Sequence, residues 1–133
     1  MANEAIQRVR KSDPIDFNCA DGTAIEKGTL LQLTGDRTVT ATSAEGDFFI
    51  GICARDKIAN DGRTTVPVFT DGIFDITVDG SNTATLAHPQ KMDGANVISD
   101  ADDDNIDKKA EVVGLALEAG SASEVIQVDI GIR

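Results

Sequence analysis

The dipeptide Asp-Gly occurs five times in this chain of 133 residues and constrains the fold more than any other feature. The copies are Asp21-Gly22, Asp61-Gly62, Asp71-Gly72, Asp79-Gly80 and Asp93-Gly94. Glycine reaches positive φ angles freely and aspartate tolerates them, so this dipeptide marks tight turns. Turns at such short intervals favour many short strands over long helices. We therefore expect an all-β protein.

The segments between these turns carry strand patterns. Ile15, Phe17 and Cys19 alternate with polar residues, and so do Leu31 and Leu33. Such alternation is typical of strands with one buried face. Residues 38–42 are rich in β-branched side chains, and residues 48–54 form a nearly continuous apolar run. That run predicts a strand buried on both faces.

The later part of the chain predicts further strand pairs. Val66 and Val68 precede Asp71-Gly72 and residues 73–78 follow it, which predicts a hairpin. Pro67 favours an edge position for the first of these strands, because proline has no N–H group to donate. Residues 110–117 and 125–132 form the last predicted pair. No convincing amphipathic helix is present, and residues 104–111 allow at most a short one.

Two stretches of the sequence are weakly similar to each other. Lys27-Gly28 opens a stretch that runs to Phe49-Ile50-Gly51-Ile52, and Asp93-Gly94 opens one that runs to Val112-Val113-Gly114-Leu115. This similarity is explained either by two related β units that close a barrel or by coincidence in a glycine-rich β protein. The sequence leaves both explanations open.

The composition excludes several classes of partner. Asp and Glu number 23 against 12 Lys and Arg, for a formal net charge of -11. Such a charge repels phosphate backbones and anionic membranes, so we expect neither nucleic acid nor a membrane as partner. The chain has no Trp and no Tyr, although these residues dominate protein hot spots and stack on sugars and bases.

The N-terminal segment differs in charge from the rest of the chain. Arg8, Arg10 and Lys11 oppose only Glu4 within the first twelve residues, and Ile6 and Val9 supply apolar anchors. We interpret residues 1–13 as an extended arm and residues 14–133 as a single β domain. A cationic arm is attracted to acidic surface, on a neighbour or on its own domain, unless it simply frays. The segment has no apolar core, so no signal peptide is expected.

An acidic loop carries the sharpest ligand-like spacing. Counted from Asp100, carboxylates occupy the first, third, fifth and twelfth places, at Asp100, Asp102, Asp104 and Glu111. This is the ligand spacing of an EF-hand calcium loop. Asn105 stands where that loop has glycine, and no amphipathic helix precedes it, so a solvated acidic loop is the preferred interpretation. The alternative interpretation is a specific calcium site, which would serve a calcium-dependent adhesion or head-fibre module.

No catalytic pattern stands out. The single histidine, His88, would need a thiolate beside it to activate a nucleophile, but Cys19 and Cys53 lie in apolar strand contexts that raise a thiol pKa. We expect two buried free thiols, although a disulfide between them stays open. Phosphate-binding and dinucleotide-binding glycine motifs are absent from the sequence. We therefore expect no enzyme activity, no cofactor and no metal.

Several short motifs follow one another along the chain. They are Gly28-Thr29-Leu30-Leu31-Gln32-Leu33, Val39-Thr40-Ala41-Thr42-Ser43-Ala44, Phe49-Ile50-Gly51-Ile52-Cys53-Ala54, Val66-Pro67-Val68, Gly72-Ile73-Phe74, Gly114-Leu115-Ala116-Leu117-Glu118 and Glu124-Val125-Ile126-Gln127-Val128. In their order and spacing these motifs resemble the capsid cement (head decoration) proteins of tailed bacterial and archaeal viruses. The likeness covers residues from about 15 to 130, and its most specific part is the closing pair of segments.

The resemblance implies a small β-barrel or β-tulip-like domain that forms a homotrimer. Such a protein is made in the host cytoplasm and binds the major capsid protein on the outer surface of the virion, at junctions between capsomers. It stabilises the head against the pressure of packaged DNA. The family has no catalytic residues, and the acidic segment 100–107 is not part of the pattern. We expect the arm to contact the capsid or a neighbouring subunit through Ile6, Arg8, Val9, Arg10 and Lys11.

Overall fold

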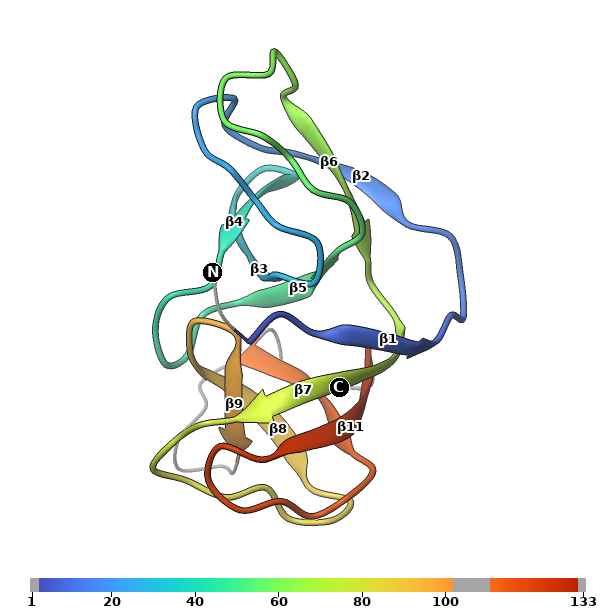
Figure 1. The fold of residues 1–133 in the computed structure, drawn as a ribbon, viewed down its shortest axis with the longest axis vertical. Coiled ribbons are helices and arrows are strands. Elements are labelled where there is room, and N and C mark those ends of the chain that lie inside the picture. Colours follow the sequence, from blue (N-terminus) through green and yellow to red (C-terminus); the bar gives the residue numbers. More distant parts are fainter. Residues whose placement is uncertain (1–2, 102–110, 132–133) are drawn as a thin grey trace.

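The computed structural model describes residues 3–101 and 111–131 and confirms the all-β prediction, with strand in 51% of the chain and no helix (Figure 1). Among these residues, accordingly, none belongs to a helix that could cross a membrane. The strands are β1 (Ile6–Val9), β2 (Ile15–Asn18), β3 (Leu30–Gly35), β4 (Thr38–Ala41), β5 (Phe49–Cys53), β6 (Thr65–Phe69), β7 (Gly72–Val78), β8 (Pro89–Gly94), β9 (Val97–Asp100), β10 (Val112–Ala116) and β11 (Val125–Ile130).

Five strands of the first half form a closed barrel in the order β2-β4-β3-β5-β6, with β6 returning to β2. All neighbours are antiparallel except β2 and β4, which pair in parallel through Asn18 and Thr38. This one parallel contact closes the ring. Closure gives each strand a partner on both sides over at least part of its length and so leaves only short stretches of free sheet edge.

The second half builds a barrel in the same way. The order is β7-β9-β8-β10-β11, and β11 returns to β7. Here too the closing contact is parallel, between β7 and β9 at Thr77↔Val97 and Val78↔Ile98. β1 adds a sixth strand on the part of the β7 edge that β9 leaves free. In Figure 1 the first barrel lies above β1 and the second below it.

The two barrels repeat one pattern of pairing, register included. Leu30↔Ile52 and Leu31↔Gly51 join β3 to β5, and Pro89↔Leu115 and Gln90↔Gly114 join β8 to β10. Each ladder then skips one residue of the second strand. The isolated bridges Ile25↔Lys57 and Ala84↔Gly120 also correspond. The chain is therefore an internal duplication of a five-stranded unit.

The duplication explains the similarity between the two sequence stretches. Of the two glycine matches that the sequence suggests, one is correct and one is wrong. Gly51 and Gly114 do correspond, and both lie against the backbone of the next strand: a Cβ there would collide with the carbonyl oxygen of Phe69 or Asp129. The other match is wrong in register. Gly94 corresponds to Gly35 at the bulged end of β3, and Gly28 corresponds to Ala87, with which it shares a positive φ.

The predicted hairpin across Asp71-Gly72 is also wrong. β6 belongs to the first barrel and β7 to the second, so this turn is the crossover between them. Pro67 does not lie on an edge strand either, because β6 pairs with β2 on one side and β5 on the other. The missing N–H group of Pro67 is tolerated because the β5–β6 ladder covers only Val68 and Phe69 and so needs no donor from Pro67. The Pro67 carbonyl still accepts a hydrogen bond from Ala54 N–H.

The barrels share one hydrophobic core. Leu30, Phe49 and Ile52 of the first barrel pack in one cluster with residues of the second, among them Phe74 and Met92. Polar contacts cross the same junction. Leu30 N–H donates to Asn96 Oδ1 at 2.9 Å, and the buried ammonium of Lys91 contacts Glu45. A smaller cluster, which contains both cysteines, fills the first barrel alone.

We predict that Gly51→Ala and Gly114→Ala each lower the free energy of unfolding by about 2 kcal/mol or more, because the new methyl group meets backbone that cannot move aside without opening the ladder. Guanidinium denaturation measures this. Gly22→Ala is the matched control, since only the Asn60 side chain comes near its Cβ, at 3.8 Å. Equal effects at all three positions would contradict the close-packing explanation.

Candidate functional site: the N-terminal arm and the pocket beneath it

The arm lies on its own domain as an added strand. Ile6 pairs with Asp75 and Gln7 with Phe74, and a bulge then brings Val9 opposite Ile73. Ala5 N–H donates to the Gly28 carbonyl of the first barrel at 2.8 Å. The arm is thus held by backbone hydrogen bonds from both barrels.

Two ion pairs fasten the arm to the second barrel. Arg8 contacts Asp75 at 2.6 Å, and Lys11 contacts Asp129 at 2.7 Å. The hydrogen bond and the charge of Asp75 raise the pKa of Arg8. Both carboxylates are only 13% exposed, whereas the side chains of Arg8 and Lys11 are 54% and 40% exposed. Solvent screens ion pairs with exposed cations, so these pairs contribute little to global stability.

Arg10 does not bind the barrels through an ion pair. It contacts Asp13 within the arm at 2.7 Å, and its guanidinium carbon lies 5.5 Å from the centre of the Phe69 ring. All three cations of the arm therefore have a partner in the same molecule. The attraction between arm and acidic domain that the charges predict takes place within one chain.

Ile6 and Val9 do not anchor the arm to its own domain. Their exposed fractions are 59% and 46%, and the buried apolar residue among residues 3–13 is Ala5. Residues directly opposite each other in an antiparallel pair project from the same face. Ile6 and Val9 therefore share a face with Asp75 and Ile73, which alternate with the buried residues of β7. With Val125 of β11, which is 59% exposed, they form an outer surface that we call the arm face.

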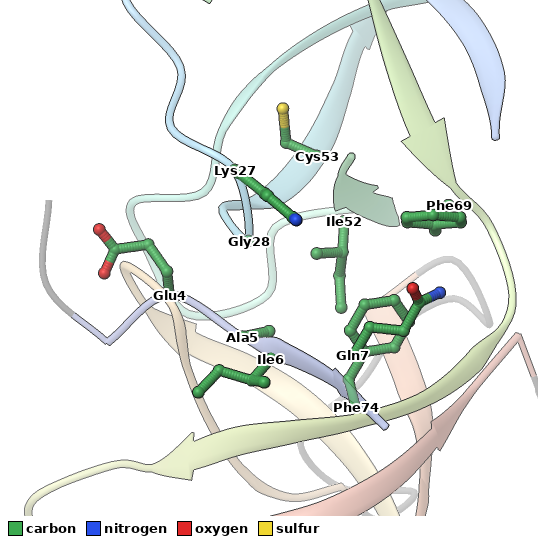
Figure 2. A pocket seen from close by; sticks show the side chains of 10 residues that line it. All are labelled: Glu4, Ala5, Ile6, Gln7, Lys27, Gly28, Ile52, Cys53, Phe69 and Phe74. Carbon is green, nitrogen blue, oxygen red and sulfur yellow. The ribbon is translucent and has the colours of Figure 1, made fainter. Parts of the chain in front are cut away.

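A pocket of about 540 Å³ lies under the arm, where β1 meets the first barrel (Figure 2). Phe69 and Phe74, one from each half of the chain, form part of its wall, with ring centres 6.0 Å apart. The full lining is Glu4, Ala5, Ile6, Gln7, Lys27, Gly28, Ile52, Cys53, Phe69 and Phe74. The lining residues come from five separate segments of the chain, so no local pattern in the sequence indicates the pocket.

The cysteines are buried and free, as expected. Burial raises the pKa of Cys53 to about 11, and burial also raises the pKa of Cys19. The His88 ring, by contrast, lies with Nε2 2.7 Å from the Ala101 carbonyl oxygen in the second barrel. His88 is not among the groups whose charge acts on either thiol. The described residues thus contain no activated Cys/His pair.

The residues of the proposed calcium loop are only partly described. Asp102 and Asp104 lie outside the described residues. Burial acts to raise the pKa of Asp100, but hydrogen bonds from Thr85 and Gln90 outweigh it and lower the pKa. These bonds occupy both carboxylate oxygens of Asp100. Among residues 3–101 and 111–131, no cluster of three or more His, Cys, Asp or Glu side chains is arranged to hold a metal ion.

Comparison with known proteins adds no relative. No protein-family model matches this chain, and no curated protein matches it. Interpretation of the site therefore rests on its own geometry and on the sequence motifs.

We predict that the Arg8→Ala, Lys11→Ala double variant leaves the global free energy of unfolding nearly unchanged, but speeds hydrogen exchange at the β1 amides. The reason is that both ion pairs hold the arm and neither supports a barrel. Amide exchange followed by NMR measures the local effect, and denaturation measures the global one. Arg37→Ala, in the turn between β3 and β4, is the control. Unchanged exchange at β1 would show that the ion pairs do not hold the arm.

We predict that neither thiol reacts quickly with a disulfide reagent at pH 8 in the native protein, and that both react on unfolding. A thiol with a raised pKa is protonated at pH 8, so its nucleophilic form is scarce. The stability that comes from keeping Cys53 neutral is complete below pH 9 and is lost as the pH rises towards 11. Thiol titration with and without guanidinium measures this, and Cys53→Ser identifies which signal belongs to which residue. Rapid labelling of either thiol in the native protein would contradict it.

Proposed function

We propose that this protein is a structural, non-enzymatic head decoration protein that binds the outer surface of a viral capsid. It would sit at junctions between capsomers and stabilise the shell against the pressure of packaged DNA. The ordered sequence motifs motivate this proposal. The arm face is the observation that carries it.

The arm face has the chemistry of a protein-binding surface. Ile6, Val9 and Val125 expose apolar area beside the ion pairs Arg8–Asp75 and Lys11–Asp129. An apolar centre among charged and polar groups is the usual anatomy of a protein interface. The exposed apolar residues of the arm itself, Ile6 and Val9, are not buried by packing against the described residues of the chain. A partner such as the major capsid protein would cover them.

The remainder of the molecule suits an external brace. Each barrel closes on itself, so neither offers a long free edge for unwanted strand pairing. The net charge of -11 keeps the protein away from the genome. A homotrimer would place three arm faces on the shell at once, and multiple attachment strengthens binding without strong individual contacts. This arrangement compensates for the absence of Trp and Tyr anchors.

The test uses heads of the virus that encodes the protein. Heads would be compared as purified, after the protein is stripped off, and after purified protein is added back. We expect bound protein to raise the temperature at which the heads release DNA, measured with a DNA-binding dye. Protein without residues 1–12 should stay folded but fail to restore it. The same rupture temperature with and without the protein would defeat the proposed role.

Calorimetry distinguishes the calcium-dependent alternative. Saturable calcium binding that Asp102→Ala abolishes would favour an adhesion or head-fibre module. The absence of any binding heat would end that alternative without affecting the decoration proposal.

A further inference from the structure

We propose that the pocket under the arm binds an apolar carboxylate, the carboxyl group lying between Gln7 and Lys27 and the apolar part against the aromatic wall. This proposal is independent of the decoration function. It rests on two hydrogen-bond donors and on the shape and composition of the pocket.

The first donor is the side-chain amide of Gln7. Its Nε2 atom is buried and has no hydrogen-bond partner among the described residues. An unsatisfied buried donor lowers stability, so a ligand acceptor that reaches it removes this cost and favours binding. The last torsion of a glutamine side chain is soft, which lets the amide turn its N–H groups towards the pocket. Figure 2 shows the Gln7 amide between Phe69 and Phe74 at one side of the pocket.

The second donor is the ammonium group of Lys27. In Figure 2 its side chain extends from beside Gly28 towards Ile52 and Gln7, into the space between the arm and the first barrel. The contacts of the described residues include no carboxylate within 4.0 Å of Lys27 Nζ. Glu4, the one acid among the described residues that line the pocket, points away from Gln7 and Lys27 (Figure 2). Gln7 and Lys27 therefore offer N–H donors to a ligand in the pocket, and Lys27 carries a positive charge.

Most of the remaining wall is apolar. Ile52, Phe69 and Phe74 supply aliphatic and aromatic surface, and the pocket volume of about 540 Å³ lies within the range of small-molecule sites. A ligand with only polar groups would leave this wall without contacts, and a cation would meet Lys27. An apolar body that carries one carboxylate satisfies both parts of the pocket. Charge-assisted hydrogen bonds to a carboxylate are also the stronger kind.

Such a ligand would tie the arm to the first barrel. Gln7 belongs to β1, whereas Lys27 lies just before β3, so a carboxylate held by both bridges the two. Binding would therefore slow hydrogen exchange at the β1 amides as well as fill the pocket. This second readout depends on where the ligand binds and not merely on whether it binds.

The probes are hexanoate and 3-phenylpropionate, with hexylamine and hexanamide as controls for charge and shape. A polypeptide that ends in an apolar residue offers the same carboxylate, so acetyl-Ala-Ala-Phe is included with its C-terminal amide as control. Titrations followed by ¹H–¹⁵N NMR should show saturable shifts of the Gln7 side-chain amide with the carboxylates alone. Binding of both kinds of acid indicates the shared group, and binding of the peptide alone indicates a chain terminus as the natural source.

Gln7→Leu and Lys27→Met should each weaken binding roughly tenfold, because each removes one hydrogen bond to a charged group. Arg37→Met removes a positive charge outside the pocket and should leave the affinity unchanged. Circular dichroism and thermal melting establish that the variants fold. For Gln7→Leu the backbone amides of Gly28 and Ile52 replace the lost side-chain signal.

Three results would overturn the proposal. The first is no saturable shift with any carboxylate at concentrations up to about 10 mM, where a ligand with a Kd of about 1 mM would nearly saturate the site. The second is equal binding of hexylamine and hexanoate. The third is an equal loss of affinity in Arg37→Met and Lys27→Met, which would indicate a general effect of charge.

Discussion

The closure of each five-stranded ring by one short parallel contact is the constraint on which the rest of this structure depends. The contact joins Asn18 to Thr38 in the first barrel and Thr77 to Val97 in the second. Closing so small a ring requires close approach elsewhere, and Gly51 and Gly114 permit it, since any side chain there would meet the next strand. The parallel closing contacts occupy corresponding positions in the two barrels, and so do the two glycines. Both barrels therefore close and pack in the same way.

The two units have the same strand pairing but differ in whether a further strand pairs with their free edge. In the second barrel, β7 extends beyond its contact with β9, and β1 occupies the free part. In the first barrel, no described strand covers Ile15–Phe17 on the side away from β6. Pro14 stands there where the second unit has Ile73, and proline has no N–H to pair. The position of the arm therefore follows from a difference between two related edges.

That position creates the features with functional potential. Because β1 lies between the barrels, its inner side borders a pocket and its outer side presents apolar residues to solvent. The arm is attached mainly by backbone hydrogen bonds and by cations on two shielded carboxylates, with one small apolar residue buried. Such attachment leaves the arm's larger apolar side chains available to a partner.

The sequence by itself determined the strand content and the difference in charge between arm and domain, because Asp-Gly turns, alternation and charge act over a few residues. It also placed the cysteines correctly in apolar surroundings. Only the tertiary structure decided that Asp71-Gly72 is a crossover, that Pro67 is tolerated within a barrel wall, and that Gly114 matches Gly51 while Gly94 does not match Gly28. The pocket arose in the same way, since Gln7, Lys27, Ile52 and Phe69 meet only when both barrels close and the arm lies between them. Pairing partners and pocket walls depend on contacts between distant segments, and no local pattern encodes those contacts.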